Sequence, residues 1–139
     1  MNIINSLKKN SLKFKKKNCI ETKNISISYE KFFEIILKTT TFLKKNNVTK
    51  KSTLAVINES FLDTIILIFA SSNIGNKIIL LDDYYSDEFK TKLIKKLKVD
   101  IIITNYLSLK NLKDIQNIKS IILLKNYDLI IRTENEKKI

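Results

Sequence analysis

The sequence predicts an α/β fold: a mostly parallel, doubly wound sheet with flanking helices, preceded by a small N-terminal β-hairpin. Short, continuously apolar segments recur from residue 53 onward, as is typical of strands buried on both faces of a parallel sheet. Segments with helical periodicity or helix-capping residues separate them. Right-handed crossovers between such strands would place helices on both faces. The 139 residues suit a single α/β unit spanning 1–139.

The first 28 residues predict a helix followed by a hairpin. The helix begins near Ile3 and runs into the basic stretch 13–17. Two β-like segments follow, at 19–22 and 25–28. They are separated by two residues, which suits a tight turn with Asn24 in the left-handed conformation.

The next segment predicts a long amphipathic helix from Tyr29 to about Lys45, with Ser28 as its N-cap. Its expected buried face consists of Phe32, Phe33, Ile36, Leu37 and Leu43. Its expected polar face consists of Lys31, Glu34, Lys38, Thr41 and Lys45. Asn46-Asn47 supplies the stop that glycine gives in most helices.

Four apolar segments then predict the strands of the sheet, at 53–57, 77–81, 101–104 and 120–124. The apolar run 129–131 is a candidate final strand.

Helices are expected between these strands. Ser60 to Asp63 has capping-box spacing and opens a helix to about Asn73, stopped by Gly75. Since this helix is apolar nearly all round, we expect it to be the most buried one. Ser86 caps a further helix whose expected buried line is Phe89, Leu93 and Leu97. Its lysines are expected to face water, at positions 90, 92, 95, 96 and 98. A short helix is expected at 108–116.

Three composition features exclude familiar catalytic sites. The chain has no histidine, which removes Ser-His-Asp and Cys-His catalysis. Its single glycine, Gly75, excludes glycine-rich phosphate and dinucleotide loops. Its single cysteine, Cys19, cannot form an internal disulfide, and we expect a half-buried apolar residue without a lowered pKa. A reducing, cytoplasmic setting follows as the default expectation.

The net charge of +12 raises the hypothesis of an anionic partner. Arg132 is the only arginine, whereas nucleic-acid binders usually use arginine for bidentate contacts. An A/T-rich genome that places lysine on solvated faces is the simpler explanation. The most apolar stretch, 64–76, is too short for a membrane span, which needs roughly 20 residues.

Polar residues follow three predicted strands, where parallel sheets bind ligands. They are Asn58-Glu59, Asp82-Asp83 and Asn105-Tyr106. The aspartate pair could hold Mg²⁺ or mimic a phospho-receiver site, but an acidic turn that leads a helix is the favoured interpretation. The adjacent Tyr84 and Tyr85 could stack on a planar ligand, although such pairs more often cover a sheet edge.

Ordered motifs then resemble one family. Residues 27–32 resemble the leucine-(Thr/Ser)-Tyr-x-Glu-Leu motif that opens adenylate-forming synthetases, which include acyl-CoA synthetases and adenylation domains of nonribosomal peptide synthetases. Residues 47–56 resemble their Gly-Val-x-x-Gly-Asp-x-Val-Ala stretch, and 58–60 the polar loop after it. Residues 72–82 resemble Lys-Ala-Gly-x-x-Tyr-(Val/Leu)-Pro-Leu-Asp, and 98–104 a later strand.

The chain also departs from the family pattern. Asn47 and Lys51 replace glycines, Ser52 replaces aspartate, and Leu80 replaces proline. Asn47 can still adopt the left-handed conformation. Lys51 and Leu80 indicate altered turns or relaxed constraint.

The resemblance covers roughly residues 18–125 and implies the N-terminal subdomain of this synthetase fold. The family's phosphate loop, rich in Thr, Ser and Gly, is absent; residues 129–135 are at best a faint echo of the strand before it. The family's adenine, ribose and catalytic-lysine motifs are absent from the 139 residues as well. We therefore assign no catalytic, cofactor-binding or metal-ligating residue. ATP and Mg²⁺ are implied only for a complete enzyme.

Three hypotheses follow. The leading one is an N-terminal fragment, or a separately encoded subunit, of an AMP-dependent ligase that activates a carboxylic or amino acid. The second is a non-catalytic interaction module that pairs with a separate remainder of the synthetase or self-associates. The third, a basic binder of nucleic acid or anionic surfaces, rests only on the net charge and ranks last.

Overall fold

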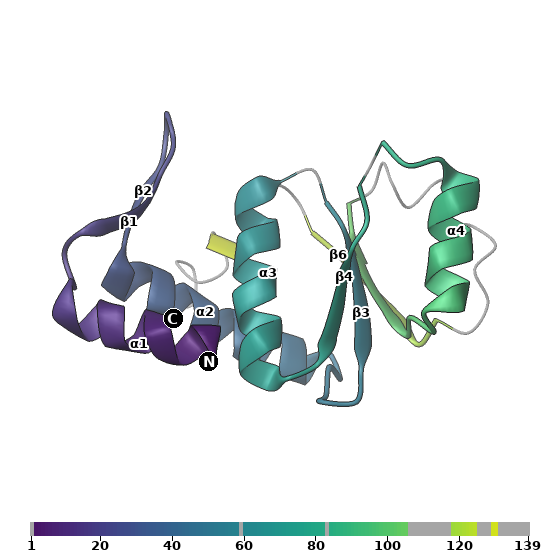
Figure 1. Cartoon of the computed structure of the whole chain (residues 1–139), viewed down its shortest axis with the longest axis horizontal. Coiled ribbons are helices and arrows are strands. Elements are labelled where there is room, and N and C mark those ends of the chain that lie inside the picture. The colour runs from purple at the N-terminus through teal and green to yellow at the C-terminus, as the bar shows by residue number, and fades with distance from the viewer. Residues whose placement is uncertain (1, 59, 83, 106–117, 125–128, 131–139) are drawn as a thin grey trace.

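The computed structural model describes residues 2–58, 60–82, 84–105, 118–124 and 129–130. A four-stranded sheet lies at its centre (Figure 1). Its strand order is β4-β3-β5-β6, and every neighbouring pair is parallel. The strands are β3 (Thr53–Ile57), β4 (Lys77–Leu80), β5 (Ile101–Thr104) and β6 (Ser120–Leu123). The predicted parallel sheet is confirmed. The predicted helix at 108–116 lies outside the described residues.

Helices cover both faces of this sheet. α3 (Phe61–Ile74) links β3 to β4 on one face, and α4 (Asp87–Lys96) links β4 to β5 on the other (Figure 1). α2 (Tyr29–Lys45) and α1 (Ile3–Lys13) pack on the side of α3 away from the sheet. The doubly wound prediction is confirmed, and α3 lies in the middle of the layers, as its apolar surface predicted.

The strands alternate their side chains between two core clusters. On β3, Leu54 and Val56 join the larger cluster with α2 and α3, whereas Ala55 and Ile57 join the smaller one. Successive residues of a strand point to opposite faces, so a strand between two helical layers must be apolar at every position. The continuous apolar runs of the sequence have this cause.

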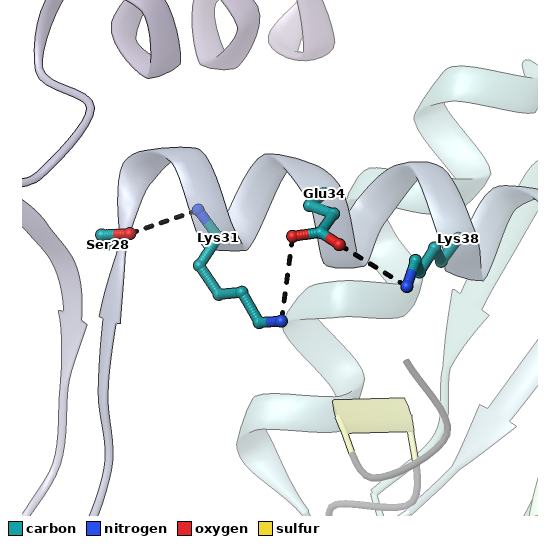
Figure 2. Close-up of polar contacts among 4 residues, drawn as sticks. All are labelled: Ser28, Lys31, Glu34 and Lys38. Atoms are coloured by element: carbon teal, nitrogen blue, oxygen red, sulfur yellow. Dashed lines mark hydrogen bonds and ion pairs between the residues drawn. The ribbon is translucent and has the colours of Figure 1, made fainter. Parts of the chain in front are cut away.

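Side-chain caps fix where the helices begin. Ser28, Ser60 and Ser86 each accept a hydrogen bond at 3.2 Å from the backbone N–H three residues later. Figure 2 shows the Ser28 cap on α2 beside Glu34, which pairs with Lys31 at 3.8 Å and Lys38 at 3.5 Å. All three predicted serine caps are confirmed.

Left-handed residues end two helices. Asn47, which follows α2, has φ +64°, so asparagine stands in for glycine as predicted. Gly75 has φ +85° at the end of α3, and its N–H donates to the carbonyl of Ser71 at 2.8 Å.

The hairpin pairs β1 (Asn18–Glu21) with β2 (Ser26–Ser28) in antiparallel fashion, as expected. The predicted left-handed Asn24 is wrong, because Asn47 and Lys98 are the non-glycine residues of positive φ in the described ranges. Thr22 closes the turn instead. Its N–H donates to the Ile25 carbonyl at 2.8 Å, and its hydroxyl accepts from the Ile25 N–H at 3.0 Å.

Some predicted buried faces are wrong. Leu37 is exposed, whereas Ile35, Thr39 and Thr40 are buried, because α2 contacts α3 through a face rotated from the predicted one. Phe61, at the first position of α3, is also exposed.

α4 differs most from its prediction. Its buried residues are Lys90 and Ile94, whereas Phe89 and Leu97 are exposed. Ile94 packs in the smaller cluster, and Lys90, one turn earlier, shares its face. A lysine stem is apolar enough to be buried in this way.

The candidate strand at 129–131 is also wrong where it can be checked. Leu129 and Ile130 are helical, and Leu129 is buried in the larger cluster. Three apolar residues cannot distinguish a strand from a buried helical turn. Within the described ranges, no helix is long and apolar enough to cross a bilayer.

Candidate functional site at the carboxyl edge of the sheet

The carboxyl ends of β3 and β4 open into a cavity of about 820 Å³. Two of the polar positions predicted after the strands, Asn58 and Asp82, line it, as do Tyr84 and Tyr85. The structure therefore has a cavity at the edge of the sheet where the sequence predicts ligand binding. Asn105, which follows β5, is not among the lining residues, and Glu59, Asp83 and Tyr106 lie outside the described part of the chain.

Asn58 is held in place by the cap of α3. Its Oδ1 accepts a hydrogen bond from the Ser60 N–H at 2.8 Å, and Ser60 Oγ in turn accepts from the Asp63 N–H at 3.2 Å. Thr64 donates its hydroxyl proton to the Ser60 carbonyl at 2.9 Å. The buried Nδ2 of Asn58 has no hydrogen-bond partner among the described residues. The Asn58 side chain is thus fixed in place, with its amide nitrogen buried.

Asp82 serves as a turn residue. Its Oδ1 accepts from the Tyr84 N–H at 2.9 Å, and its carbonyl accepts from the Tyr85 N–H at 3.1 Å. This geometry supports the interpretation of an acidic turn that leads α4. Tyr84 is 97% exposed, while Tyr85 packs edge-on against Phe89 with ring centroids 5.1 Å apart.

The described residues give no support to a metal or receiver site at this edge. They contain no group of three or more His, Cys, Asp or Glu side chains that could hold a metal ion. The strand β5 ends in Thr104, which is fully buried, rather than in the aspartate that a receiver domain needs.

A nucleotide phosphate site does not fit these residues either. Phosphate loops need several glycines whose backbone N–H groups approach the phosphates. Gly75 is the only glycine of the chain, and it ends α3 before the amino end of β4. The chain therefore contains no glycine-rich loop that could bind the phosphates of ATP.

Cys19 lies in a separate, apolar cavity of about 350 Å³ between the hairpin and the helices α1, α2 and α3. The thiol is half-buried, and burial raises its pKa above the ordinary value. A raised pKa keeps the thiol protonated at neutral pH, so Cys19 is no activated nucleophile, as the sequence predicted.

Two cavity-lining residues of α3, Phe61 and Thr64, were not predicted as site residues from the sequence. Phe61 belongs to the helix that we expected to be the most buried one, yet it is 79% exposed. The sequence position of Phe61 could have indicated this exposure. The first turn of a helix that follows a parallel strand lies at the carboxyl edge of the sheet, where ligands bind.

Comparisons with profiles of protein families and with curated proteins return no match. Solved structures share the fold. Coronafacic acid ligase from Pectobacterium brasiliense matches 95% of this chain and 29% of its own, with 20% identity and a TM-score of 0.83. A Mycobacterium tuberculosis fatty acyl CoA synthetase matches 96% of this chain and 28% of its own, with 11% identity and a TM-score of 0.82.

The N-terminal subdomain of Klebsiella oxytoca NpsA matches 96% of this chain, with 12% identity and a TM-score of 0.73. These neighbours are adenylate-forming ligases, and the fold of this chain is that of their N-terminal subdomain. The fold implied by the sequence resemblance is confirmed. The chain spans about a third or less of the matched chains, at 28–33%. At these identities the likeness concerns the fold alone.

Proposed function

We propose that this chain is the N-terminal portion of an AMP-forming ligase, which is catalytically incomplete without the rest of that enzyme. The observation that carries the proposal is the match of 95% of this chain to 29% of an acid ligase. The motif order along residues 27–104 supports it independently. A complete enzyme of this kind joins a carboxylic or amino acid to AMP and releases pyrophosphate from ATP, with Mg²⁺.

In this proposal the chain supplies scaffold rather than reacting groups. The cavity at the carboxyl edge is lined by Asn58, Thr64 and Asp82, and their polar groups make hydrogen bonds that cap α3 and close the turn after β4. ATP and Mg²⁺ would be held by the rest of the enzyme, on the same polypeptide or on a second one.

The carboxyl edge also carries a cluster of exposed apolar side chains. We call it the carboxyl-edge patch, and it consists of Phe61, Leu80, Tyr84, Tyr85 and Phe89. Four of these side chains line the cavity, and Phe89 packs edge-on against Tyr85. Apolar clusters of this kind usually mark a surface that another protein segment covers. About two thirds or more of each matched chain lies outside the part that this chain matches, so we propose the equivalent remainder of a synthetase as the occupant.

A capture experiment tests this surface. The tagged chain is expected to retain the remainder of the synthetase, expressed as a separate polypeptide, and the Phe61→Ser/Tyr84→Ser variant should retain at least ~10-fold less, since buried aromatic anchors dominate interfaces. Leu12→Ser changes an exposed apolar residue on α1, outside the carboxyl-edge patch, and serves as the control. Equal capture by the wild type and the double variant would refute the proposed docking surface.

Self-association is the alternative use of the same patch. In that case light scattering would show a dimer of the purified chain, and the Phe61→Ser/Tyr84→Ser variant would be a monomer. A monomeric wild type would dismiss this alternative.

A further inference from the structure

The segment from Lys8 to Lys17 concentrates positive charge at the start of the chain. We call it the N-terminal lysine patch, and its members are Lys8, Lys9, Lys13, Lys15, Lys16 and Lys17. All six side chains are exposed. No acidic residue occurs before Glu21, so this segment carries its charge without internal compensation.

The patch has an apolar centre. α1 buries Ile4, Leu7 and Ser11 against the body of the protein. Lys8 and Lys9 lie on the opposite face with Leu12, since residues three and four apart on a helix are neighbours. Leu12 is 65% exposed, one turn after Lys8 and Lys9 and next to Lys13, the last residue of α1. An exposed apolar side chain among lysines is a combination found on elements that lie on a membrane surface.

Some lysines elsewhere in the chain pair with carboxylates. On α2, Glu34 pairs with both Lys31 and Lys38 (Figure 2). On α4, Lys92 pairs with Glu88 at 3.3 Å. Within the described residues, no lysine of the N-terminal lysine patch forms an ion pair. Residues 8–17 hold all six lysines of the patch and no acidic side chain, and this local excess of positive charge favours an anionic partner.

A ring contact fixes part of the patch. The ammonium groups of Lys13 and Lys17 each lie 5.1 Å from the centroid of the Phe14 ring. Phe14 in turn packs against Tyr29, with centroids 6.1 Å apart. Cation–π contacts hold Lys13 at the end of α1 and Lys17 just beyond it.

The location of α1 leaves this face accessible. In Figure 1, α1 lies at one end of the molecule and α4 at the other, with α3 and the sheet between them. A flat surface could therefore contact α1 without covering the cavity at the carboxyl ends of β3 and β4.

We propose that the N-terminal lysine patch binds the surface of an anionic lipid bilayer. The lysines contact the lipid phosphates, and Leu12 enters the boundary between headgroups and acyl chains. Nucleic acid fits less well, because none of the six cations is an arginine and Phe14, the aromatic ring of the segment, is covered by two lysines. This inference is independent of the proposed ligase function.

Sedimentation with lipid vesicles tests the charge requirement. The full chain should bind phosphatidylglycerol/phosphatidylcholine vesicles at low salt, bind pure phosphatidylcholine poorly, and dissociate as salt rises. The Lys15→Gln/Lys16→Gln/Lys17→Gln variant should bind roughly 100-fold more weakly, at about fivefold per lysine. The Lys92→Gln/Lys95→Gln/Lys96→Gln variant removes the same charge from α4 and should bind nearly as the wild type. Equal losses in both variants, or no binding at low salt, would overturn the proposal.

A fluorescent reporter tests the role of Leu12. The chain has no tryptophan, so Leu12→Trp provides a single indole at the centre of the patch. Its emission should shift to the blue on anionic vesicles and stay unchanged with duplex DNA, and circular dichroism checks that each variant is folded. A blue shift with DNA, together with tighter binding to DNA than to vesicles at equal salt, would contradict the lipid assignment and favour nucleic acid.

Discussion

The two faces of the sheet are built differently. On one face α3, backed by α2 and α1, encloses the larger apolar cluster, to which the hairpin also contributes. On the other face α4 covers a smaller cluster around Ile94, and Phe89, Leu97 and Ile121 remain exposed there or nearby. The first face is a finished core, whereas the second face and the adjoining carboxyl edge retain apolar surface for another segment to cover. This asymmetry is what a portion of a larger enzyme would show.

The largest effect is expected on the first face. Ile66 of α3 is fully buried in the larger cluster. Ile66→Ala should lower the free energy of unfolding by about 4 kcal/mol, because it removes buried methyl groups and leaves a cavity between packed layers. Urea denaturation followed by circular dichroism measures it. A loss below ~1 kcal/mol would contradict the finished core.

A smaller loss is expected on the second face. Ile94→Ala should cost about 2 kcal/mol, since its surroundings in the smaller cluster are less extensive and can relax. Ile66→Ala is the same substitution at a nearly equally buried side chain, since Ile94 is 1% exposed and Ile66 is 0% exposed. Should Ile94→Ala cost as much as Ile66→Ala, the two faces would be equally well packed.

The N-caps of α3 and α4 allow the two faces to be compared through smaller changes in the free energy of unfolding. Ser60 caps α3 and is buried, whereas Ser86 caps α4 and is exposed. Ser60→Ala should destabilise by about 1–2 kcal/mol and Ser86→Ala by roughly 0.5 kcal/mol, since water replaces the exposed cap more easily. Equal effects in thermal denaturation would show that burial does not govern the caps.

The smallest effect concerns Cys19, which is half-buried beside the first face. Burial raises the pKa of its thiol in the folded chain, so the unfolded chain loses this proton first as pH rises. The thiol contribution to stability is therefore present below the ordinary thiol pKa and is lost as pH rises above it. Cys19→Ser should flatten that part of the stability profile. At neutral pH, iodoacetamide should alkylate Cys19 more slowly in the folded than in the unfolded chain; equal rates would contradict the raised pKa.

Much of the architecture could be predicted from the sequence, because serine caps, Asn47, Gly75 and continuous apolar strands are local signals. The face that α4 buries could not. Phe89, Leu93, Ile94 and Leu97 offer two adjacent apolar lines, and the approach of the helix to the sheet selects the one that also buries Lys90. The exposure of Phe61 was missed for a similar reason, since apolar content does not reveal which end of a helix meets an uncovered edge.

The candidate site was predicted in location rather than in chemistry. The strand ends predict Asn58 and Asp82, both of which line the cavity, whereas Asn105, which follows β5, is not among the lining residues. The absence of histidine and of glycine-rich loops predicts that the chain has no self-contained active site.

ATP–pyrophosphate exchange tests the central claim most directly. The purified chain, supplied with ATP, Mg²⁺ and a panel of carboxylic and amino acids, should show no exchange above background. The same chain combined with the remainder of the synthetase should show acid-dependent exchange. Exchange by the chain alone would contradict the claim that it is the catalytically incomplete N-terminal portion of an AMP-forming ligase.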